Sequence, residues 1–364
     1  MSVKLLSQGG YGCVYYPGLF CDGKPLDNDK LVTKLQVDAE WTDREILIGS
    51  LILKINNFKL YFAPVIESCD VNIKKFNDPN ILDKCEIIKP EMQNYKIMFI
   101  PYIEKQGFLY TLFKDYNSRI ILYLLEINKQ LLSSIKKLID NSLIHFDLKA
   151  ENIILNKQNS YPIIIDFGIS ILKNRLSEKT YKNYFYSYHP EYTPWALEIH
   201  LICYFVKFNK LGSRVTEDDI LKVCSEFSYS NKRFNKVFSK EFIYNYKTKS
   251  IEFYSQFIDE DVNYLIKYLI SISWRTWDFY SISILNLQIF DLIFNNKFFK
   301  NKLLNRFFEY TLLSLHYDPE KRPSIQQGTA NIQSLYSKNN LEDNIKLFEL
   351  MKLYINKIDI KDII

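Results

Sequence analysis

The sequence predicts a mixed α+β fold, with short strands over most of the first hundred residues and helices over most of the rest. Residues 3–6 and 31–34 are short apolar runs bounded by turn-forming residues, which is the pattern of strands. Apolar residues recur at helical spacing from Glu40 to Ile55, and again in the long amphipathic stretch from Arg119 to Asn141. The chain therefore combines a strand-rich first part with a helix-rich second part.

The chain is long for one average domain, but its length does not require a second independent domain. The chain has 364 residues, of which 47% are hydrophobic and 16% aromatic, enough to build a large core. Its net charge is +5, from 47 Lys plus Arg against 42 Asp plus Glu, and no dense block of like charge is present. A balance this mild gives no reason to expect a nucleic-acid partner.

The cysteines and the N-terminus predict a cytoplasmic protein. Six cysteines are scattered without a C-x-x-C pair or metal-ligand spacing, so we expect free thiols in a reducing compartment. They are Cys13, Cys21, Cys69, Cys85, Cys203 and Cys224. The N-terminal residues lack the apolar region of a signal peptide, and no apolar run approaches the length of a membrane span. We therefore expect no membrane contact.

The stretch from His145 to Gly168 contains the residues with the clearest chemistry. Asp147, Asn152 and Asp166 are separated by two apolar runs, at 153–155 and 163–165, that read as adjacent strands. Such strands would bring the three polar groups to one end. An acceptor for a hydroxyl proton beside two oxygen ligands for Mg²⁺ is what phosphoryl transfer requires.

The strings HFDLKAEN (145–152) and DFG (166–168) resemble the catalytic loop and the metal-binding motif of the eukaryotic-type protein kinases. This resemblance implies an α+β, two-lobed kinase-like fold with a small antiparallel β-sheet lobe and a larger, mainly helical lobe. The small lobe would span about 1–101 and the large lobe about 102–336, followed by a helical extension over 337–364.

The resemblance also implies an activity, namely Mg²⁺- and ATP-dependent phosphorylation of Ser and Thr hydroxyls on protein substrates. Asp147 would be the catalytic base, and Lys149 would contact the γ-phosphate. Asn152 and Asp166 would hold Mg²⁺, or Mn²⁺ in its place. A lysine two residues after the catalytic Asp is typical of serine/threonine kinases more than of tyrosine kinases.

The N-terminal string SQGGYGCVYY resembles the glycine-rich nucleotide loop G-x-G-x-x-G-x-V, with Ser in the place of the first Gly. Glycines are needed there because the backbone must come close to the triphosphate to donate N–H bonds. The nucleotide contacts expected from this loop are Ser7, Gly9, Gly10, Tyr11, Gly12 and Val14.

Two further small-lobe residues are expected to position the phosphates. Lys34 ends a strand; a lone lysine there is usually a solvated charge, but between these motifs it resembles the phosphate-binding lysine of kinases. Glu45 lies on the apolar stripe of the following helix and is the expected partner of Lys34. Glu40 is the alternative, closer in sequence to Lys34 but off that stripe.

Near the link to the large lobe, Ile100 is the expected gatekeeper and Tyr102 an expected adenine contact.

The activation segment is expected to follow Gly168 and to end on a buried carboxylate. Glu198 is favoured over Glu191 because its neighbours are aromatic and apolar. Its expected partner is Arg322 in DPEKRP (318–323), which matches a late kinase motif. Asp278 stands in a string resembling D-x-W-S-x-G, so residues 199–277 form an apparent insertion without an assigned role.

Phe146 stands where most kinases have the Arg of H-R-D. That Arg normally binds a phosphorylated activation segment, and Phe has no donor with which to do so. We therefore expect packing of the aromatic segment from Tyr181 to Trp195 to order this region. The alternative is that Lys173 or Arg175 takes over the role of the Arg.

The overall pattern resembles the serine/threonine kinases of nucleocytoplasmic large DNA viruses, which would place the protein in a host cytoplasm or a virion. Two rival functions are that of a pseudokinase scaffold, suggested by Ser7 and the altered anchor motif, and that of a small-molecule phosphotransferase.

The basic stretch from Lys297 to Arg306 is expected to be a solvated helix face, and Leu341 to Ile364 a helix packed on the large lobe.

Overall fold

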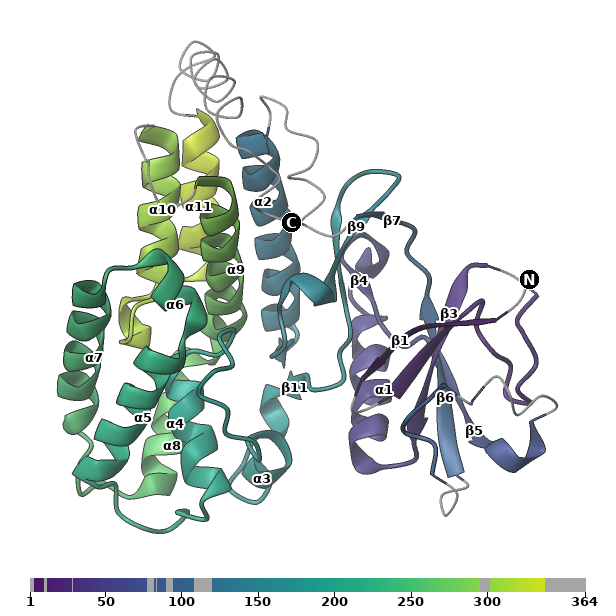
Figure 1. Cartoon of the computed structure of the whole chain (residues 1–364), viewed down its shortest axis with the longest axis horizontal. Coiled ribbons are helices and arrows are strands. Elements are labelled where there is room, and N and C mark those ends of the chain that lie inside the picture. Colours follow the sequence, from purple (N-terminus) through teal and green to yellow (C-terminus); the bar gives the residue numbers. More distant parts are fainter. Residues whose placement is uncertain are drawn as a thin grey trace. The chain divides into compact units, whose positions relative to one another are not determined.

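The structure, a computed structural model, describes residues 3–9, 12–27, 29–76, 82, 84–89, 94–107, 120–294 and 302–337. The chain divides into two compact units, one formed by residues 1–108 and 151–170 and the other by residues 109–150 and 171–364. We call them the N-terminal unit and the C-terminal unit. The first carries the larger sheets and the second is mainly helical (Figure 1), so the predicted mixed α+β fold is confirmed.

A five-stranded antiparallel sheet forms the centre of the N-terminal unit, in the order β1-β2-β3-β6-β5. Its strands are β1 (Lys4–Gly9), β2 (Gly12–Tyr16), β3 (Leu31–Val37), β5 (Glu67–Asn72) and β6 (Asn94–Pro101). Helix α1 (Glu40–Ile52) follows β3 and buries Glu45 together with Ile48 and Ile52. The predicted helix is therefore present but ends three residues earlier than the apolar pattern suggested, and buried Ile55 follows it.

A second, smaller sheet of this unit has the order β4-β10-β9-β7. Its strands are β4 (Phe62–Ala63), β7 (Lys105–Gly107), β9 (Ile153–Asn156) and β10 (Pro162–Ile165). Strands β9 and β10 pair antiparallel, with Ile154 opposite Ile163, so the predicted pair of adjacent strands is confirmed. Short 3-10 turns in this unit are η1 (Phe58–Leu60) and η2 (Ile73–Lys75), while η5 (Ala150–Asn152) lies where the chain enters β9.

Four of the six cysteines form disulfides, so the prediction of free thiols was wrong for them. The bonded pairs are Cys13–Cys85 and Cys21–Cys69. The sequence separations are 72 and 48 residues, so only the folded sheet brings these side chains together, and sequence spacing could not reveal them. The two remaining cysteines are buried thiols of the C-terminal unit: Cys203 and Cys224.

The C-terminal unit is built on helices whose apolar faces pack on one another. The predicted long helix is α2 (Ile120–Asp140), which packs against α9 and α11. Figure 1 shows α2, α9, α10 and α11 side by side. The other helices are α3 (Tyr181–Tyr184), α4 (Leu197–Lys207), α5 (Glu217–Ser230), α6 (Lys232–Val237), α7 (Lys240–Ser255), α8 (Val262–Ser273), α9 (Trp277–Phe294), α10 (Lys302–Ser314) and α11 (Ile325–Ser337). Strands β8 (Leu143–Ile144) and β11 (Ile171–Leu172) pair antiparallel, and the 3-10 turns are η6 (Lys173–Arg175), η7 (Trp274–Thr276) and η8 (Pro319–Lys321).

The segment 199–277 is packed into the C-terminal unit. Helix α5 begins with a complete capping box, in which the Thr216 side chain and the Asp219 side chain each accept the other residue's backbone N–H. Helix α5 packs on α4 and α7, and α4 also packs on α8. The buried hydroxyls of Tyr246 and Tyr254 on α7 donate to the backbone oxygens of Leu315 and Tyr317. The segment therefore supports the chain just before the DPEKRP motif.

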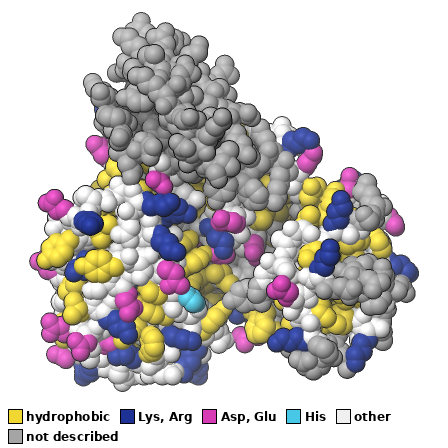
Figure 2. Space-filling model, viewed as in Figure 1, with side chains coloured by type: hydrophobic (Ala, Val, Ile, Leu, Met, Phe, Trp, Pro, Cys, Tyr) yellow, Lys and Arg dark blue, Asp and Glu magenta, His cyan; other side chains and the backbone are white. Residues whose placement is uncertain are grey.

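No helix in the described ranges is long and apolar enough to cross a membrane. Figure 2 shows Lys and Arg side chains interspersed with Asp and Glu on the described part of the visible face. The predicted helix over 341–364, and residues 297–301 of the basic stretch, lie outside the described residues.

Candidate active site

Lys34, Glu45 and Asp166 meet in the N-terminal unit, and we call these three residues the Lys34 cluster. The Lys34 ammonium donates to both carboxylate oxygens of Glu45, at 3.0 and 2.9 Å, and to Oδ1 of Asp166 at 3.0 Å. Burial alone would lower the pKa of Lys34, but the two carboxylates outweigh that effect and raise it above its usual value. Lys34 is therefore a permanent, desolvated cation next to the predicted metal ligand Asp166.

Neighbouring residues hold the Glu45 carboxylate in place. Gln36, two residues after Lys34 on β3, donates to Glu45 Oε2 at 3.2 Å. The hydroxyl of Thr42 lies 3.1 Å from Gln36 Oε1 and 2.7 Å from the Val37 backbone oxygen. Glu45 is thus the partner of Lys34, and the alternative partner Glu40 is exposed at the start of α1. Sequence reasoning missed Gln36 and Thr42, although both are polar residues at buried positions.

The turn after Asp166 needs glycine for steric reasons. A Cβ atom on Gly168 would lie 3.2 Å from Glu45 Oε2, 3.3 Å from Asp166 Oδ1 and 3.5 Å from Lys34 Nζ. Asp166 itself has a positive φ of 61°, a conformation that Asp adopts more readily than most residues. The backbone of the DFG string therefore lies directly against the Lys34 cluster.

The glycine-rich string forms the β1–β2 hairpin of the same unit. Ser7 pairs with Val14 and Gly9 with Gly12, while Gly10 and Tyr11 lie outside the described residues. A Cβ atom on Gly9 would meet nothing within 4 Å, whereas one on Gly12 would lie 2.8 Å from the Leu35 backbone oxygen. Gly12 is therefore required by the sheet itself. The space beside Gly9 is open, so a ligand could approach its backbone closely.

The donor set available for Mg²⁺ consists of oxygens of the N-terminal unit. Asn152 is buried at the end of η5, immediately before β9, and the Asp166 side chain is 46% exposed. Across the described ranges, no three His, Cys, Asp or Glu side chains cluster so as to hold a metal by themselves. A carboxylate and an amide that leave the remaining ligand positions to phosphate oxygens and water are the usual protein contribution to a nucleotide-bound Mg²⁺. These residues fit that role.

The two residues expected near the adenine lie at the end of β6. Ile100 pairs with Val32 of β3. The backbone N–H of Tyr102 donates to the Lys30 backbone oxygen at 2.8 Å, and its ring stacks on that of Tyr16 at 4.1 Å. This stack connects the end of β6 with the end of β2.

Asp147 and Lys149 belong to the C-terminal unit, where they form a close pair. The Lys149 ammonium lies 2.9 Å from each carboxylate oxygen of Asp147. The Tyr192 hydroxyl also donates to Asp147 Oδ1. Sequence reasoning missed Tyr192, because it is one of several tyrosines in the activation segment and nothing in its spacing distinguishes it.

Asp278 of α9 fixes the backbone of the predicted catalytic loop. Its buried carboxylate accepts the N–H of His145 at 2.7 Å and that of Phe146 at 2.9 Å. Burial raises the pKa of Asp278, opposed by His145 and by these two hydrogen bonds. Phe146 has φ of 69°, which is costly for an aromatic residue, and the paired N–H bonds hold it there. Asp278 therefore determines the conformation from which Asp147 projects.

The predicted aromatic packing around Phe146 is present. Its ring lies 4.8 Å from that of Trp195 and 5.8 Å from those of Phe185 and Trp277. Tyr181 packs on Phe185 at 6.2 Å. The Trp195 indole N–H also donates to the Phe146 backbone oxygen at 2.8 Å. The activation segment is thus attached to the catalytic loop by aromatic side chains.

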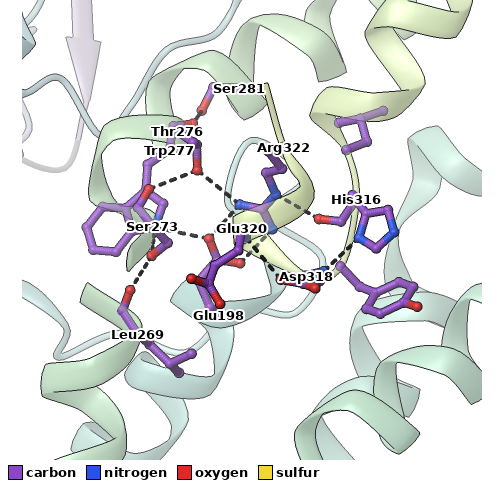
Figure 3. A network of polar contacts seen from close by, with 12 residues as sticks. Glu198, Leu269, Ser273, Thr276, Trp277, Ser281, His316, Asp318, Glu320 and Arg322 are labelled. Carbon is purple, nitrogen blue, oxygen red and sulfur yellow. Dashed lines mark hydrogen bonds and ion pairs between the residues drawn. The ribbon is translucent and has the colours of Figure 1, made fainter. Parts of the chain in front are cut away.

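Glu198, and not Glu191, is the buried carboxylate at the end of the expected activation segment. Arg322 binds its two carboxylate oxygens at 2.6 and 2.8 Å, and both side chains are almost fully buried. Figure 3 shows this pair at the centre of a polar network, where the Trp277 indole also donates to Glu198 and Arg322 donates to the His316 backbone oxygen. The remaining polar groups of the pair are thereby satisfied, as a buried ion pair requires.

Part of the chain is similar to known proteins. Residues 66–193 match a family model described as protein tyrosine and serine/threonine kinase. A curated relative, the probable serine/threonine-protein kinase 2 of Plasmodium falciparum, is 28% identical over 119 residues. That match covers 29% of this chain and 23% of the relative, so the chain spans about a quarter of that protein's length.

These matches support the assignment of this chain to the protein kinase superfamily. The β-sheet unit and the helical unit agree with a two-lobed kinase fold.

Proposed function

We propose that this protein is an ATP- and Mg²⁺-dependent protein kinase that phosphorylates Ser and Thr hydroxyls. The observation that supports this function best is the Lys34 ammonium held between Glu45 and Asp166. In active kinases, a lysine fixed by a helix glutamate holds the nucleotide phosphates, and the DFG aspartate holds the metal. The Lys34 cluster has both parts in contact.

The chain's own residues would act as follows. The Asp147 carboxylate accepts the proton of the substrate hydroxyl while the oxygen of that hydroxyl forms a bond to the γ-phosphorus. The bond from that phosphorus to the β,γ-bridging oxygen breaks, and ADP leaves. Lys149 and Lys34 bind phosphate oxygens, and Asn152 and Asp166 would hold Mg²⁺. Mg²⁺ bound there would supply neutralisation of the charge that develops on the phosphates.

The choice of Ser and Thr over Tyr is supported by two observations. Lys149 follows the base by two residues and contacts it directly. The Plasmodium falciparum relative is named as a probable serine/threonine-protein kinase. We therefore expect protein substrates with Ser or Thr acceptors.

The resemblance to large-DNA-virus kinases and the cytoplasmic location stay proposals. The two disulfides remove the support that cysteine usage gave to a reducing compartment, because disulfides persist mainly in oxidising ones.

The test is phosphate transfer from radiolabelled ATP to casein, with Mg²⁺ or Mn²⁺, followed by phosphoamino acid analysis. Asp147→Asn should abolish transfer, whereas Asp140→Asn, a matched change at an exposed carboxylate at the end of α2, should not. Label on Ser and Thr that depends on Asp147 supports the proposal. ATP binding without transfer would indicate a pseudokinase, and transfer only to small molecules would indicate the other rival.

A further inference from the structure

The catalytic carboxylate of Asp147 is held by a tyrosine of the activation segment. Tyr192 donates its hydroxyl hydrogen to Asp147 Oδ1. Lys149 lies 2.9 Å from both carboxylate oxygens, and its ammonium is 5.9 Å from the centre of the Tyr192 ring. One carboxylate thus receives a phenol and an ammonium within the same unit, from residues 45 positions apart in the chain.

Tyr192 is itself held firmly. Its ring packs edge-on against Trp195 at 4.9 Å. Trp195 in turn donates its indole N–H to the Phe146 backbone oxygen, immediately before Asp147. The Ser281 hydroxyl of α9 donates to the Pro194 backbone oxygen at 2.8 Å, which fixes the chain between the two aromatic residues. The phenol therefore has a defined position relative to the catalytic loop.

Lys149 and Tyr192 differ in how well they can orient Asp147 during the reaction. Lys149 has a flexible four-carbon stem, and in the proposed function it also binds the γ-phosphate, so its contact with Asp147 changes when ATP binds. Tyr192 has only two side-chain torsions and carries no net charge that a phosphate could attract. A general base must stay within hydrogen-bond reach of the proton that it takes. A phenol that keeps its contact throughout is suited to maintain that geometry.

We propose that Tyr192 is a positioning residue for the catalytic base. Its hydroxyl fixes the direction of the Asp147 carboxylate, so that the carboxylate meets the substrate hydroxyl in the correct orientation. The proposal rests on the proposed function and names a residue that supports the base from the activation segment. It joins the order of that segment to catalysis through a hydrogen bond from an uncharged donor.

The principal test is Tyr192→Phe, which removes one oxygen and keeps the ring that packs on Trp195. Loss of a hydrogen bond to a charged group corresponds to a fall of about tenfold or more in kcat for a Ser/Thr substrate. The KM for ATP should stay within about twofold, because its predicted ligands other than Lys149 lie in the N-terminal unit and the substitution leaves Lys149 itself unchanged. The matched control is Tyr264→Phe, an exposed phenol on α8, which should change neither constant. An unchanged or increased kcat in Tyr192→Phe would overturn the proposal; an increase would show that the phenol blocks the base.

A second measurement does not depend on activity. Thermal melting is compared for the wild type, Tyr192→Phe, Asp147→Ala and the double variant. Tyr192→Phe should lower Tm by about 2–4 °C with Asp147 intact, and by less than about 1 °C in the Asp147→Ala background. Equal shifts in both backgrounds would show that the two side chains do not interact, which would also overturn the proposal. A wild type that shows this coupling but transfers no phosphate would refute the proposed function, and with it a catalytic purpose for the contact.

Discussion

Activity should not depend on phosphorylation of the activation segment, because aromatic packing already orders it. Among the described residues, three ring contacts join the segment to Phe146 and to Trp277 of α9: Trp195 and Phe185 contact Phe146 at 4.8 and 5.8 Å between ring centres, and Phe185 contacts Trp277 at 6.2 Å. Aromatic pairs contribute about 0.5–1.5 kcal/mol each beyond the area they bury, so the three together contribute about 1.5–4.5 kcal/mol. A hundredfold activation by phosphate would correspond to about 2.7 kcal/mol. The packing is thus of the size needed to replace phosphate-driven ordering.

The assay compares phosphatase-treated and untreated protein. Mass spectrometry first confirms that phosphate is absent from four Ser and Thr hydroxyls of the segment, those of Ser177, Thr180, Ser187 and Thr193. Initial rates are then measured at short times, before the protein can phosphorylate itself again. We expect the two rates to agree within about threefold, which is about 0.6 kcal/mol.

A fall of about a hundredfold after phosphatase treatment would refute this reasoning. Lys173 or Arg175 would then be the residue that binds phosphate, in place of the missing Arg. The complementary change is Phe146→Ala, which should lower the free energy of unfolding by about 3–5 kcal/mol because the ring is buried among large aromatic residues. Its rate should fall whether or not the segment is phosphorylated.

Four other predictions follow from the same structure. Lys34→Met and Asp166→Ala should each abolish phosphate transfer while circular dichroism still shows a folded protein; near-normal turnover in Lys34→Met would contradict its role. Glu198→Gln should lower the free energy of unfolding in urea by about 3–5 kcal/mol, because it leaves the buried Arg322 charge without its partner. Burial lowers the pKa of His200 to about 4, below its unfolded value of about 6.5, so the unfolded state takes up a proton first as the pH falls. Stability should therefore decrease from pH 6.5 to pH 4 by up to about 3 kcal/mol, and His200→Phe should remove this part of the acid sensitivity. Reducing the two disulfides should lower Tm, because closing a loop of 72 residues stabilises by about 4 kcal/mol in the chain-entropy description.

The parts of the fold and site that the sequence predicted are those encoded locally or by a distinctive motif. Helix α1 was recognised because its apolar stripe repeats at helical spacing, and Glu45 was chosen over Glu40 because it lies on that stripe. The strands β9 and β10 were recognised from short runs of isoleucine. Glu198 was preferred because its neighbours are apolar, and its pairing with Arg322 is confirmed.

The parts that the sequence did not predict depend on contacts between distant segments. Tyr192 reaches Asp147 from 45 residues away, and Gln36 supports Glu45 from a neighbouring element. Neither residue type is unusual for its place, so only three-dimensional packing distinguishes them. The same holds for segment 199–277, whose buried tyrosines hold the backbone before the DPEKRP motif.

The two disulfides also join segments that are distant in the sequence, and one of them bears on the predicted nucleotide site. The loop that one bond closes lies inside the loop closed by the other, since the pair 21–69 lies within the pair 13–85. Cys13 follows Gly12 directly and precedes Val14 on β2, the strand that carries the second half of the predicted nucleotide hairpin. The bond to Cys85 therefore fixes that hairpin strand to a segment that is not part of the sheet. Because Cys13 faces the buried core while its neighbours are the expected nucleotide contacts, opening this bond would loosen the strand behind the nucleotide site and leave the Lys34 cluster on β3 in place.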